Sequence, residues 1–277
     1  MWCPSREPVS ENHAVPLLGL DWALPAFDAA TFNPRRNDYA LCVFVLNEEE
    51  RIRAQVRRMH ALGLAVDVVI ADGGSTDGAV MPDFLAEHGV RALLTKRGPG
   101  ALSAQMRMGF AWCLREGYAG IVTIDGNGKD DVSAVPSFVD ALRAGVDHVQ
   151  GSRYVSGGRG VNTPAARHYG VTLVHAPLLS LAARHRYTDT TNGFRAYSRR
   201  FLLDPRVLPF RDVFVGYELH YYLAIRAARL GFLVQELPVT RAYPAHGPVP
   251  SKISGWRGNI RVLKTLWRSV RGAYDPE

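Results

Sequence analysis

The sequence predicts an α/β protein built on a mainly parallel β-sheet with helices on both faces. Between residues 39 and 151, short apolar runs rich in β-branched residues alternate with longer segments of helical period. Such alternation is typical of βα units, which form parallel sheets. Several of the apolar runs end directly in polar, glycine-containing turns. The chain has 277 residues, of which 47% are hydrophobic, so it can bury one large core.

The first part of the chain contains the clearest periodic segments. The run 41–46 has the composition of a buried strand, and Ile52, Val56 and Met59 then share one face of a helix. The following segments repeat this pattern. The predicted strands are 41–46, 66–71, 91–95, 121–124 and 148–151, and the helices between them are 48–62, 80–88, 101–116 and 135–142.

After residue 151 the regular alternation of short apolar runs and helical segments ends. A glycine- and arginine-rich loop, 152–162, precedes a long helix over 164–185, for which Pro164 suits the first turn. Within that helix, the low-charge stretch 171–183 is interrupted by His175 and Pro177 and is too short to span a bilayer. A loop over 189–195 follows, and then a helix, a strand and a proline-rich loop at 217–230, 232–237 and 238–250.

We expect three parts: an N-terminal extension, 1–37, that packs on the domain; the α/β domain, 38–252; and a C-terminal amphipathic helix, 253–277. The stretch 252–271 has an apolar face flanked by six basic residues, and it contains no acid. The face comprises Trp256, Ile260, Leu263, Trp267 and Val270, and the cations are Lys252, Arg257, Arg261, Lys264, Arg268 and Arg271. This pattern fits a helix at a membrane surface, or equally a helix docked on the domain.

Composition narrows the function classes. Lys and Arg outnumber Asp and Glu by 33 to 26, and the net charge of +7 favours phosphorylated ligands, nucleic acid or an anionic membrane surface. Three widely spaced cysteines indicate neither disulfides nor zinc, and the N-terminus lacks the pattern of a secretory signal. We expect a cytoplasmic protein, peripheral on the cytoplasmic face of the membrane if the terminal helix binds there.

The most informative segment is the turn after the fourth predicted strand of this series. Asp125-Gly126-Asn127 is followed by Asp130 and Asp131, so several oxygen ligands stand at a strand end. Ligands bind at the carboxyl ends of strands in open α/β sheets, and carboxylate and amide oxygens suit Mg²⁺ or Mn²⁺. The alternative is a solvated acidic turn that caps the helix from residue 132.

Two earlier strands also end in polar groups. Asn47-Glu48-Glu49-Glu50 follows the first strand, and Asp72-Gly73-Gly74-Ser75-Thr76-Asp77-Gly78 follows the second. Both segments also suit helix starts or turns. A carboxylate in Asp72's position is suited to a base or ribose. The G-x-G-x-x-G fingerprint does not follow the first strand and no phosphate-binding G-x-x-x-x-G-K-[ST] motif occurs, so other nucleotide folds are disfavoured.

Taken in chain order, these strand ends resemble those of family 2 glycosyltransferases, which have the Rossmann-like GT-A fold. Further segments resemble the polyprenyl-phosphate branch, which includes dolichol-phosphate mannose synthases. They are Lys96-Arg97-Gly98-Pro99-Gly100, Gly151-Ser152-Arg153-Tyr154, Gly157-Gly158, Arg167 and Gly193-Phe194-Arg195. The resemblance covers about residues 39 to 252.

The resemblance implies a metal-dependent, inverting transfer of a hexose from a GDP- or UDP-sugar to a polyprenyl phosphate. It implies that Asp125, Asn127 and Asp131 hold Mg²⁺ or Mn²⁺, that Arg153 and Arg167 receive the acceptor phosphate, and that Asp189, Glu218 and Arg195 serve catalysis. The implied donor-binding residues are Phe44, Leu46, Glu48, Asp72, Gly74, Ser75, Lys96, Asp125, Gly126 and Lys252.

The sequence departs from the family pattern in places. The second acid of the family's D-x-D motif is Asn127 here, which removes one negative charge from the metal site. Phe44 and Leu46 stand where proline and tyrosine are usual, and Gly73 stands where a second aspartate follows Asp72, so the base is not fixed. The loop 240–252 is longer and richer in proline than the branch's compact turn.

The acceptor decides whether a base is required. A phosphate monoester, with a second pKa of about 6, is already a dianion at neutral pH, whereas a sugar or natural-product hydroxyl needs a carboxylate such as Asp189 or Glu218. Three further alternatives are a nucleotide-sugar-binding protein without activity, an RNA-binding module and a nucleotidyltransferase. RNA is disfavoured because no RNA-recognition signature occurs, so no nucleic acid partner is expected.

Overall fold

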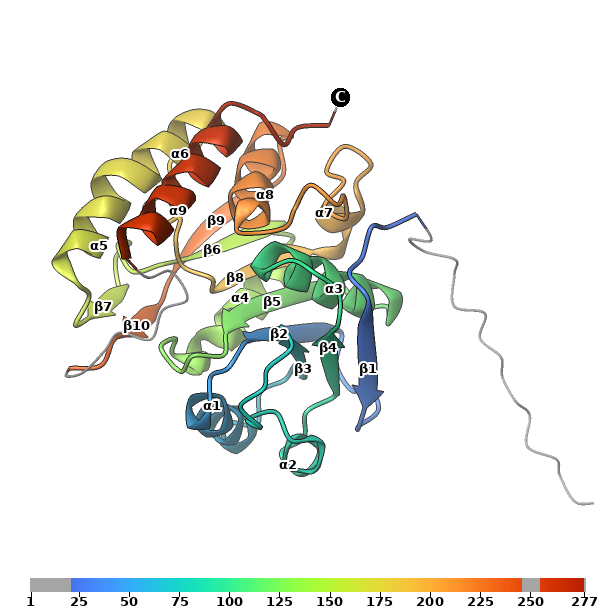
Figure 1. The fold of residues 1–277 in the computed structure, drawn as a ribbon. Helices are drawn as coiled ribbons and strands as arrows, with labels where there is room; N and C mark the ends of the chain where they lie inside the picture. The colour runs from blue at the N-terminus through green and yellow to red at the C-terminus, as the bar shows by residue number, and fades with distance from the viewer. Residues whose placement is uncertain (1–20, 246–254, 277) are drawn as a thin grey trace, which may run out of the picture.

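An eight-stranded β-sheet forms the frame of the molecule (Figure 1). The computed structural model describes residues 21–245 and 255–276. The strand order is β1-β4-β3-β2-β5-β8-β6-β9. The strands are β1 (Phe27–Thr31), β2 (Tyr39–Val45), β3 (Asp67–Asp72), β4 (Ala92–Lys96), β5 (Gly120–Asp125), β6 (His148–Ser152), β8 (Arg195–Ser198) and β9 (Val234–Pro238).

The predicted parallel centre is confirmed. β2 pairs in parallel with β3 on one side and with β5 on the other, and β3 pairs in parallel with β4. In this register Val45 lies opposite Asp72, and Phe44 lies opposite Asp125. The carboxyl ends of β3 and β5 therefore present Asp72 and Asp125 at one edge of the sheet, on either side of β2.

Helices cover both faces of the sheet because successive side chains of the central strands point to opposite faces. Ala40, Cys42 and Phe44 of β2 face the core beneath α3 and α8, whereas Leu41 and Val43 face the core on the other side. That second side is covered by α1, α2 and α4. The bounds of these helices are α1 (Glu50–Ala61), α2 (Pro82–Glu87), α3 (Leu102–Arg115), α4 (Val135–Arg143) and α8 (Glu218–Arg229).

Five short elements were not predicted. β8 runs antiparallel between β5 and β6 and is followed by α7 (Arg199–Leu203), so the sheet is mixed on this side. β7 (Arg159–Val161) and β10 (Thr240–Ala242), both in segments predicted to be loops, form a separate two-stranded parallel ribbon. β1 lies inside the segment predicted as an N-terminal extension and pairs antiparallel with β4, so the sheet begins before residue 38.

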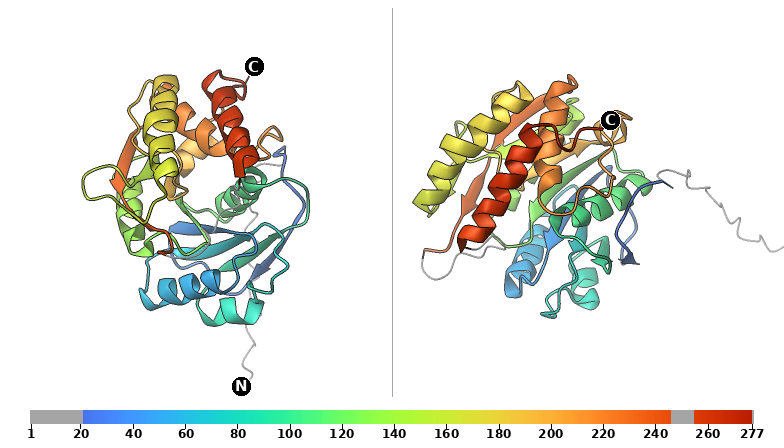
Figure 2. Two further views of the ribbon diagram at one scale, coloured as in Figure 1. Left: turned by 60° about the vertical axis from the view of Figure 1, so that its left-hand side comes forward. Right: turned by 45° about the horizontal axis from the view of Figure 1, so that its top comes forward.

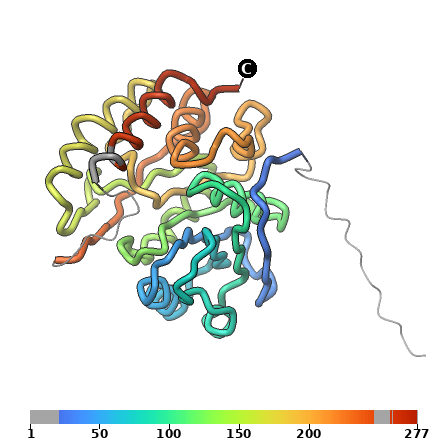
Figure 3. The backbone as a smooth tube through the Cα atoms, in the orientation of Figure 1, coloured from blue at the N-terminus to red at the C-terminus, as the bar shows by residue number. Residues whose placement is uncertain are grey.

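The long helix predicted over 164–185 is continuous but not uniform. It consists of α5 (Ala165–Gly170), a π-helical segment (Val171–His175) and α6 (Ala176–Ala183). Pro177 lies two residues after the end of the π-helical segment, and proline cannot donate a backbone hydrogen bond, which explains a local change of helical pattern. Figure 3 shows that the backbone continues from α5 to α6 without leaving the helical path.

The C-terminal helix α9 (Gly255–Val270) lies beside α6 and α8, as both views in Figure 2 show. Val262, Leu266 and Val270 pack into the cluster that it shares with those helices. Of the predicted apolar face, Val270 packs inward, whereas Ile260, Leu263 and Trp267 remain exposed. The side chain of Trp256 lies outside the described part of the structure. Across the described ranges, no helix combines the length and apolar character needed to cross a membrane.

Candidate active site

Asp125 ends β5 in a turn that is fixed from two sides. The Gly126 amide donates to the Phe44 carbonyl of β2 at 2.8 Å. Gln55 of α1 donates to the Asp125 carbonyl at 3.1 Å and accepts from the Gly128 amide at 2.9 Å. A side chain at position 126 would approach Val45 to 2.7 Å, so the close contact with β2 explains the glycine.

The Asp125 carboxylate lies beside a guanidinium that the sequence interpretation missed. Arg241 of β10 donates to Asp125 at 2.9 Å and to both Asp130 oxygens at 2.6 and 2.7 Å. Burial opposes ionisation of Asp125, but Arg241 outweighs it and lowers the pKa of this carboxyl below its usual value. For Asp130 burial dominates and raises the pKa.

The three predicted metal ligands are not all brought together. The Asn127 amide donates to Asp125 at 3.3 Å, so these two are neighbours. Asp131 instead accepts from Arg58 of α1 at 2.7 Å, and from the Ser133 amide at the start of the 3₁₀ turn Val132–Ala134. Within residues 21–245 and 255–276, no cluster of three His, Cys, Asp or Glu side chains is arranged to hold a metal ion.

Lys129 adds a second cation that was not predicted. Its carbonyl accepts from the Ala242 amide, which ties the acidic turn to β10. Its ammonium lies 5.4 Å from the centre of the Tyr243 ring. Burial, followed by repulsion from Arg241, lowers the pKa of Lys129 to about 8.

Asp72 organises the turn at the end of β3. Its carboxylate accepts from the Gly74 and Ser75 amides at 3.0 to 3.2 Å and from the Ser75 hydroxyl. Gly74 has a φ of 94°, which glycine adopts without strain. Asn47, at the end of β2, donates its amide to Ser75 and accepts from Thr76. These hydrogen bonds connect the polar turn after β2 to the polar turn after β3.

The other predicted donor-binding residues differ in their surroundings. Phe44 is buried against Phe110, whereas Leu46 is exposed. Glu48 is buried and pairs with Arg51 at 3.1 Å, and Lys96 donates to the Gly98 carbonyl at 2.7 Å. Lys252 lies outside the described residues.

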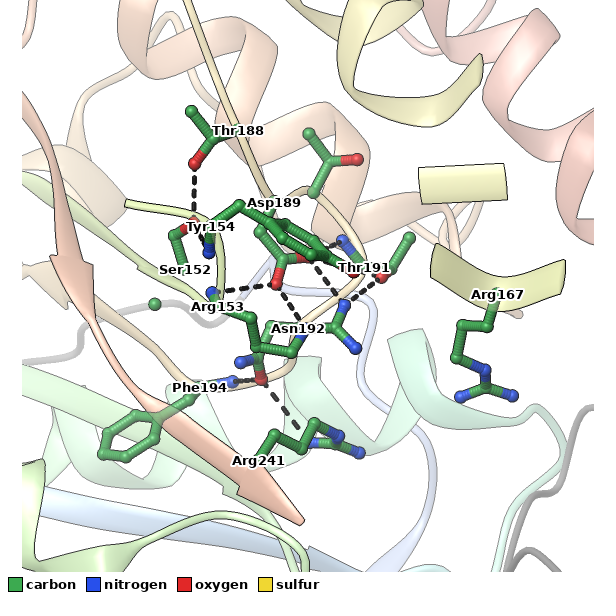
Figure 4. A network of polar contacts seen from close by, with 12 residues as sticks. Ser152, Arg153, Tyr154, Arg167, Thr188, Asp189, Thr191, Asn192, Phe194 and Arg241 are labelled. Carbon is green, nitrogen blue, oxygen red and sulfur yellow. Dashed lines mark hydrogen bonds and ion pairs between the residues drawn. The ribbon is translucent and has the colours of Figure 1, made fainter. Parts of the chain in front are cut away.

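Arg153, predicted to receive the acceptor phosphate, forms a buried pair with Asp189 (Figure 4). Its Nε and one terminal nitrogen donate to the two Asp189 oxygens at 2.6 and 2.9 Å. Both side chains are at most 1% exposed. The Asp189 carboxylate, predicted as a candidate base, is therefore held by an arginine.

Arg167 of α5 lies at the edge of this network (Figure 4). It donates to the Tyr243 hydroxyl at 3.3 Å, and Arg153 donates to the same hydroxyl at the same distance. The two arginines that were predicted as acceptor ligands thus converge on one tyrosine. Tyr243 itself was not predicted.

Arg195 and Glu218 have structural contacts. The Arg195 guanidinium is buried and donates to the carbonyls of Thr190, Asn192 and His220, which fastens the loop 189–195 to α8. Glu218 accepts from the Gly216 amide and lines a cavity of about 440 Å³ beneath α9, together with Arg261 and Lys264. Among the described residues, neither side chain forms a hydrogen bond or ion pair with the Asp125 carboxylate.

Comparisons with known proteins agree with this arrangement. Residues 40–204 match the model of glycosyl transferase family 2. The chain is 32% identical over 257 residues to polyprenol monophosphomannose synthase of Mycolicibacterium smegmatis, covering 90% of this chain and 92% of that protein. It is 30% identical over 229 residues to undecaprenyl-phosphate mannosyltransferase of Micrococcus luteus, covering 80% of this chain and 90% of that protein.

A solved structure shares the fold. Glucosyl-3-phosphoglycerate synthase of Mycobacterium tuberculosis, in complex with Mn²⁺, UDP-glucose and phosphoglyceric acid, has a TM-score of 0.57 at 20% identity, covering 86% of this chain and 80% of that one. The fold is therefore the GT-A fold, as predicted. Together with the family match over most of the sheet, this shows that the chain belongs to glycosyl transferase family 2 and is a glycosyltransferase.

Proposed function

We propose that the protein transfers a hexose, with inversion, from a nucleotide diphosphate sugar to a polyprenyl phosphate. The observation that carries this proposal is the gathering of Arg153, Arg167 and Lys129 around Tyr243, two residues from the Arg241 that contacts Asp125. Cations of this kind suit a phosphate. The names of the two mannosyl-transferring relatives support the same acceptor class.

A phosphate acceptor suits this site better than a hydroxyl acceptor. A hydroxyl needs a base within hydrogen-bond reach, and the Asp189 carboxylate is buried and paired with Arg153. A phosphate monoester is a dianion at neutral pH and attacks once it is positioned. The transferred sugar then forms a new bond from its anomeric carbon to the acceptor oxygen, as its bond to the nucleoside diphosphate breaks.

For the donor, we propose that Asp72, Ser75 and Glu48 line the nucleoside side and that Asp125 faces the diphosphate. A divalent ion, Mg²⁺ or Mn²⁺, fits this site with fewer protein ligands than the sequence predicted. Such ions often take one or two carboxylates and complete their shell with water and substrate phosphates. Asp125 and the Asn127 oxygen would hold it, although in this structure the first pairs with Arg241 and the second accepts from the Lys129 amide. Asp131 is turned away from Asp125 and pairs with Arg58. When bound, the ion would neutralise charge on the diphosphate.

Transfer of labelled hexose from GDP- and UDP-sugars to short polyprenyl phosphates tests the proposal. We expect a product with at least one donor. Arg167→Ala should raise the acceptor KM by about 10- to 100-fold, the value of a charge-assisted hydrogen bond of roughly 1.5 to 3 kcal/mol. Arg143→Ala, on α4, is the matched control. Absence of product with every donor would reject the function.

We also propose that the protein binds a membrane surface, on the cytoplasmic face, through α9. Ile260, Leu263 and Trp267 are exposed on this helix. Arg261, Lys264 and Arg268 lie among them and would attract anionic lipid. The neighbouring helices α5 and α6 and the segment between them add exposed apolar residues, namely Tyr169, Leu173 and Leu181.

This surface predicts salt-sensitive binding to vesicles that contain anionic lipid. Leu263→Ser with Trp267→Ser should reduce the bound fraction in a sedimentation assay by about tenfold, because both changes remove apolar area from the interface. Leu62→Ser removes a comparably exposed leucine at the end of α1 and should leave binding unchanged. Equal loss in both variants would contradict a surface centred on α9.

A further inference from the structure

Tyr243 holds a position that the proposed function does not by itself explain. It follows β10 directly and is 3% exposed. Its backbone is fixed, because its amide donates to the Val161 carbonyl at 3.0 Å and its carbonyl accepts from the Asn162 side chain at 3.2 Å. The ring is therefore set by the β7–β10 ribbon.

Three cationic side chains contact Tyr243. Arg153 and Arg167 each donate to the hydroxyl at 3.3 Å. The Arg167 guanidinium also lies 5.5 Å from the ring centre, and the Lys129 ammonium lies 5.4 Å from it. A phenol oxygen can accept two hydrogen bonds, and the ring face attracts cations, so one side chain can contact all three.

The two arginines depend on Tyr243 to different degrees. Arg153 is already fixed by Asp189 and by the Thr191 hydroxyl. For Arg167, within the described ranges, the Tyr243 hydroxyl is the one hydrogen-bond partner of the guanidinium. Without the hydroxyl, Arg167 would keep its contact with the ring face but lose this hydrogen bond, and repulsion from Arg153 would then act against a weaker restraint.

Resting on the proposed function, we infer that Tyr243 is a positioning residue that sets Arg153 and Arg167 at the spacing required by the acceptor phosphate. Its place in the chain extends the role. Arg241 of β10 lies two residues earlier. Arg241 contacts Asp125 at the donor side, so the end of β10 aligns the acceptor phosphate with the donor.

Tyr243→Phe tests this inference because it removes only the oxygen. We expect the acceptor KM to rise by about tenfold or more, while the donor KM and the rate at saturating acceptor change by less than about threefold. Tyr154→Phe is the matched control. The Tyr154 ring also lies beside Arg153, at 5.2 Å, but its hydroxyl has no partner in the described structure. This control should leave both KM values unchanged.

A double variant separates positioning from a general loss of packing. If Tyr243 acts through Arg167, adding Tyr243→Phe to Arg167→Ala should raise the acceptor KM by less than about threefold beyond Arg167→Ala alone. If the two substitutions together raise the acceptor KM by the product of their separate effects, the inference is overturned. If Tyr243→Phe does not fold, Tyr243→His, which keeps an aromatic hydrogen-bond acceptor, gives the same comparison and should retain part of the acceptor affinity.

Calorimetry with a short polyprenyl phosphate tests the proposed acceptor separately from the proposed role of Tyr243. If the wild-type protein binds none, the proposed acceptor is wrong. If the wild-type protein binds it and Tyr243→Phe binds it equally well, the acceptor stands and the role of Tyr243 is overturned. Weaker binding by Tyr243→Phe, with unchanged binding by Tyr154→Phe, supports both.

Discussion

Asp125→Asn is expected to lower kcat/KM for hexose transfer by about 10²- to 10³-fold, the usual effect of removing one charged group from an electrostatic site. Asp125 ends β5 beside the ends of β2 and β3, where ligands bind in open α/β sheets. The asparagine keeps the size of the side chain but removes the charge that a divalent ion needs. Binding of Mn²⁺ in the presence of GDP or UDP, measured by calorimetry, should weaken in parallel.

Asp131→Asn is the matched control for this change. Asp131 was predicted as a metal ligand beside Asp125, but it pairs with Arg58 on a partly exposed surface, and its side chain is 34% exposed. Pairs of this kind contribute about 1 kcal/mol or less. We therefore expect transfer by Asp131→Asn to stay within about threefold of the wild type. Equal losses in both variants would restore Asp131 as a ligand and contradict the site described above.

The aspartates at the strand ends show how much of the site the sequence predicts. The strand-end argument predicted that Asp72 and Asp125 share an edge, and the register of β2 with β3 and β5 confirms it. Strong apolar periodicity made those strands easy to identify. Which of Asp130 and Asp131 turns inward depends on the conformation of the turn. The pairing of Asp130 with β10 decides it, and the sequence pattern of the turn does not contain that information.

Distant pairings account for what the sequence did not predict. Arg241 reaches Asp125 across 116 positions because β10 lies against the acidic turn. In the sequence, β10 is three residues inside a proline-rich loop, and the equally short β7 is glycine-containing. β8 has four residues and acquires its place between β5 and β6 only in the assembled sheet. Short elements of this kind carry too few residues for a periodic signal.

Asp189→Asn is expected to lower the free energy of unfolding by about 3 to 5 kcal/mol, because it leaves the buried Arg153 guanidinium without its counter-ion. Urea denaturation followed by circular dichroism measures this change. Asp140→Asn breaks an exposed pair with Arg143 and should cost about 1 kcal/mol or less. The comparison therefore isolates the effect of burial.

The same variant distinguishes the two acceptor classes. If Asp189 were the base for a hydroxyl acceptor, the folded Asp189→Asn protein would show no transfer, and Arg167→Ala would spare activity. If Asp189 holds Arg153 in place for a phosphate acceptor, the folded Asp189→Asn protein retains transfer with a raised acceptor KM. The buried pair favours the second outcome, because a carboxylate that accepts from two guanidinium nitrogens is poorly placed to take a proton from substrate.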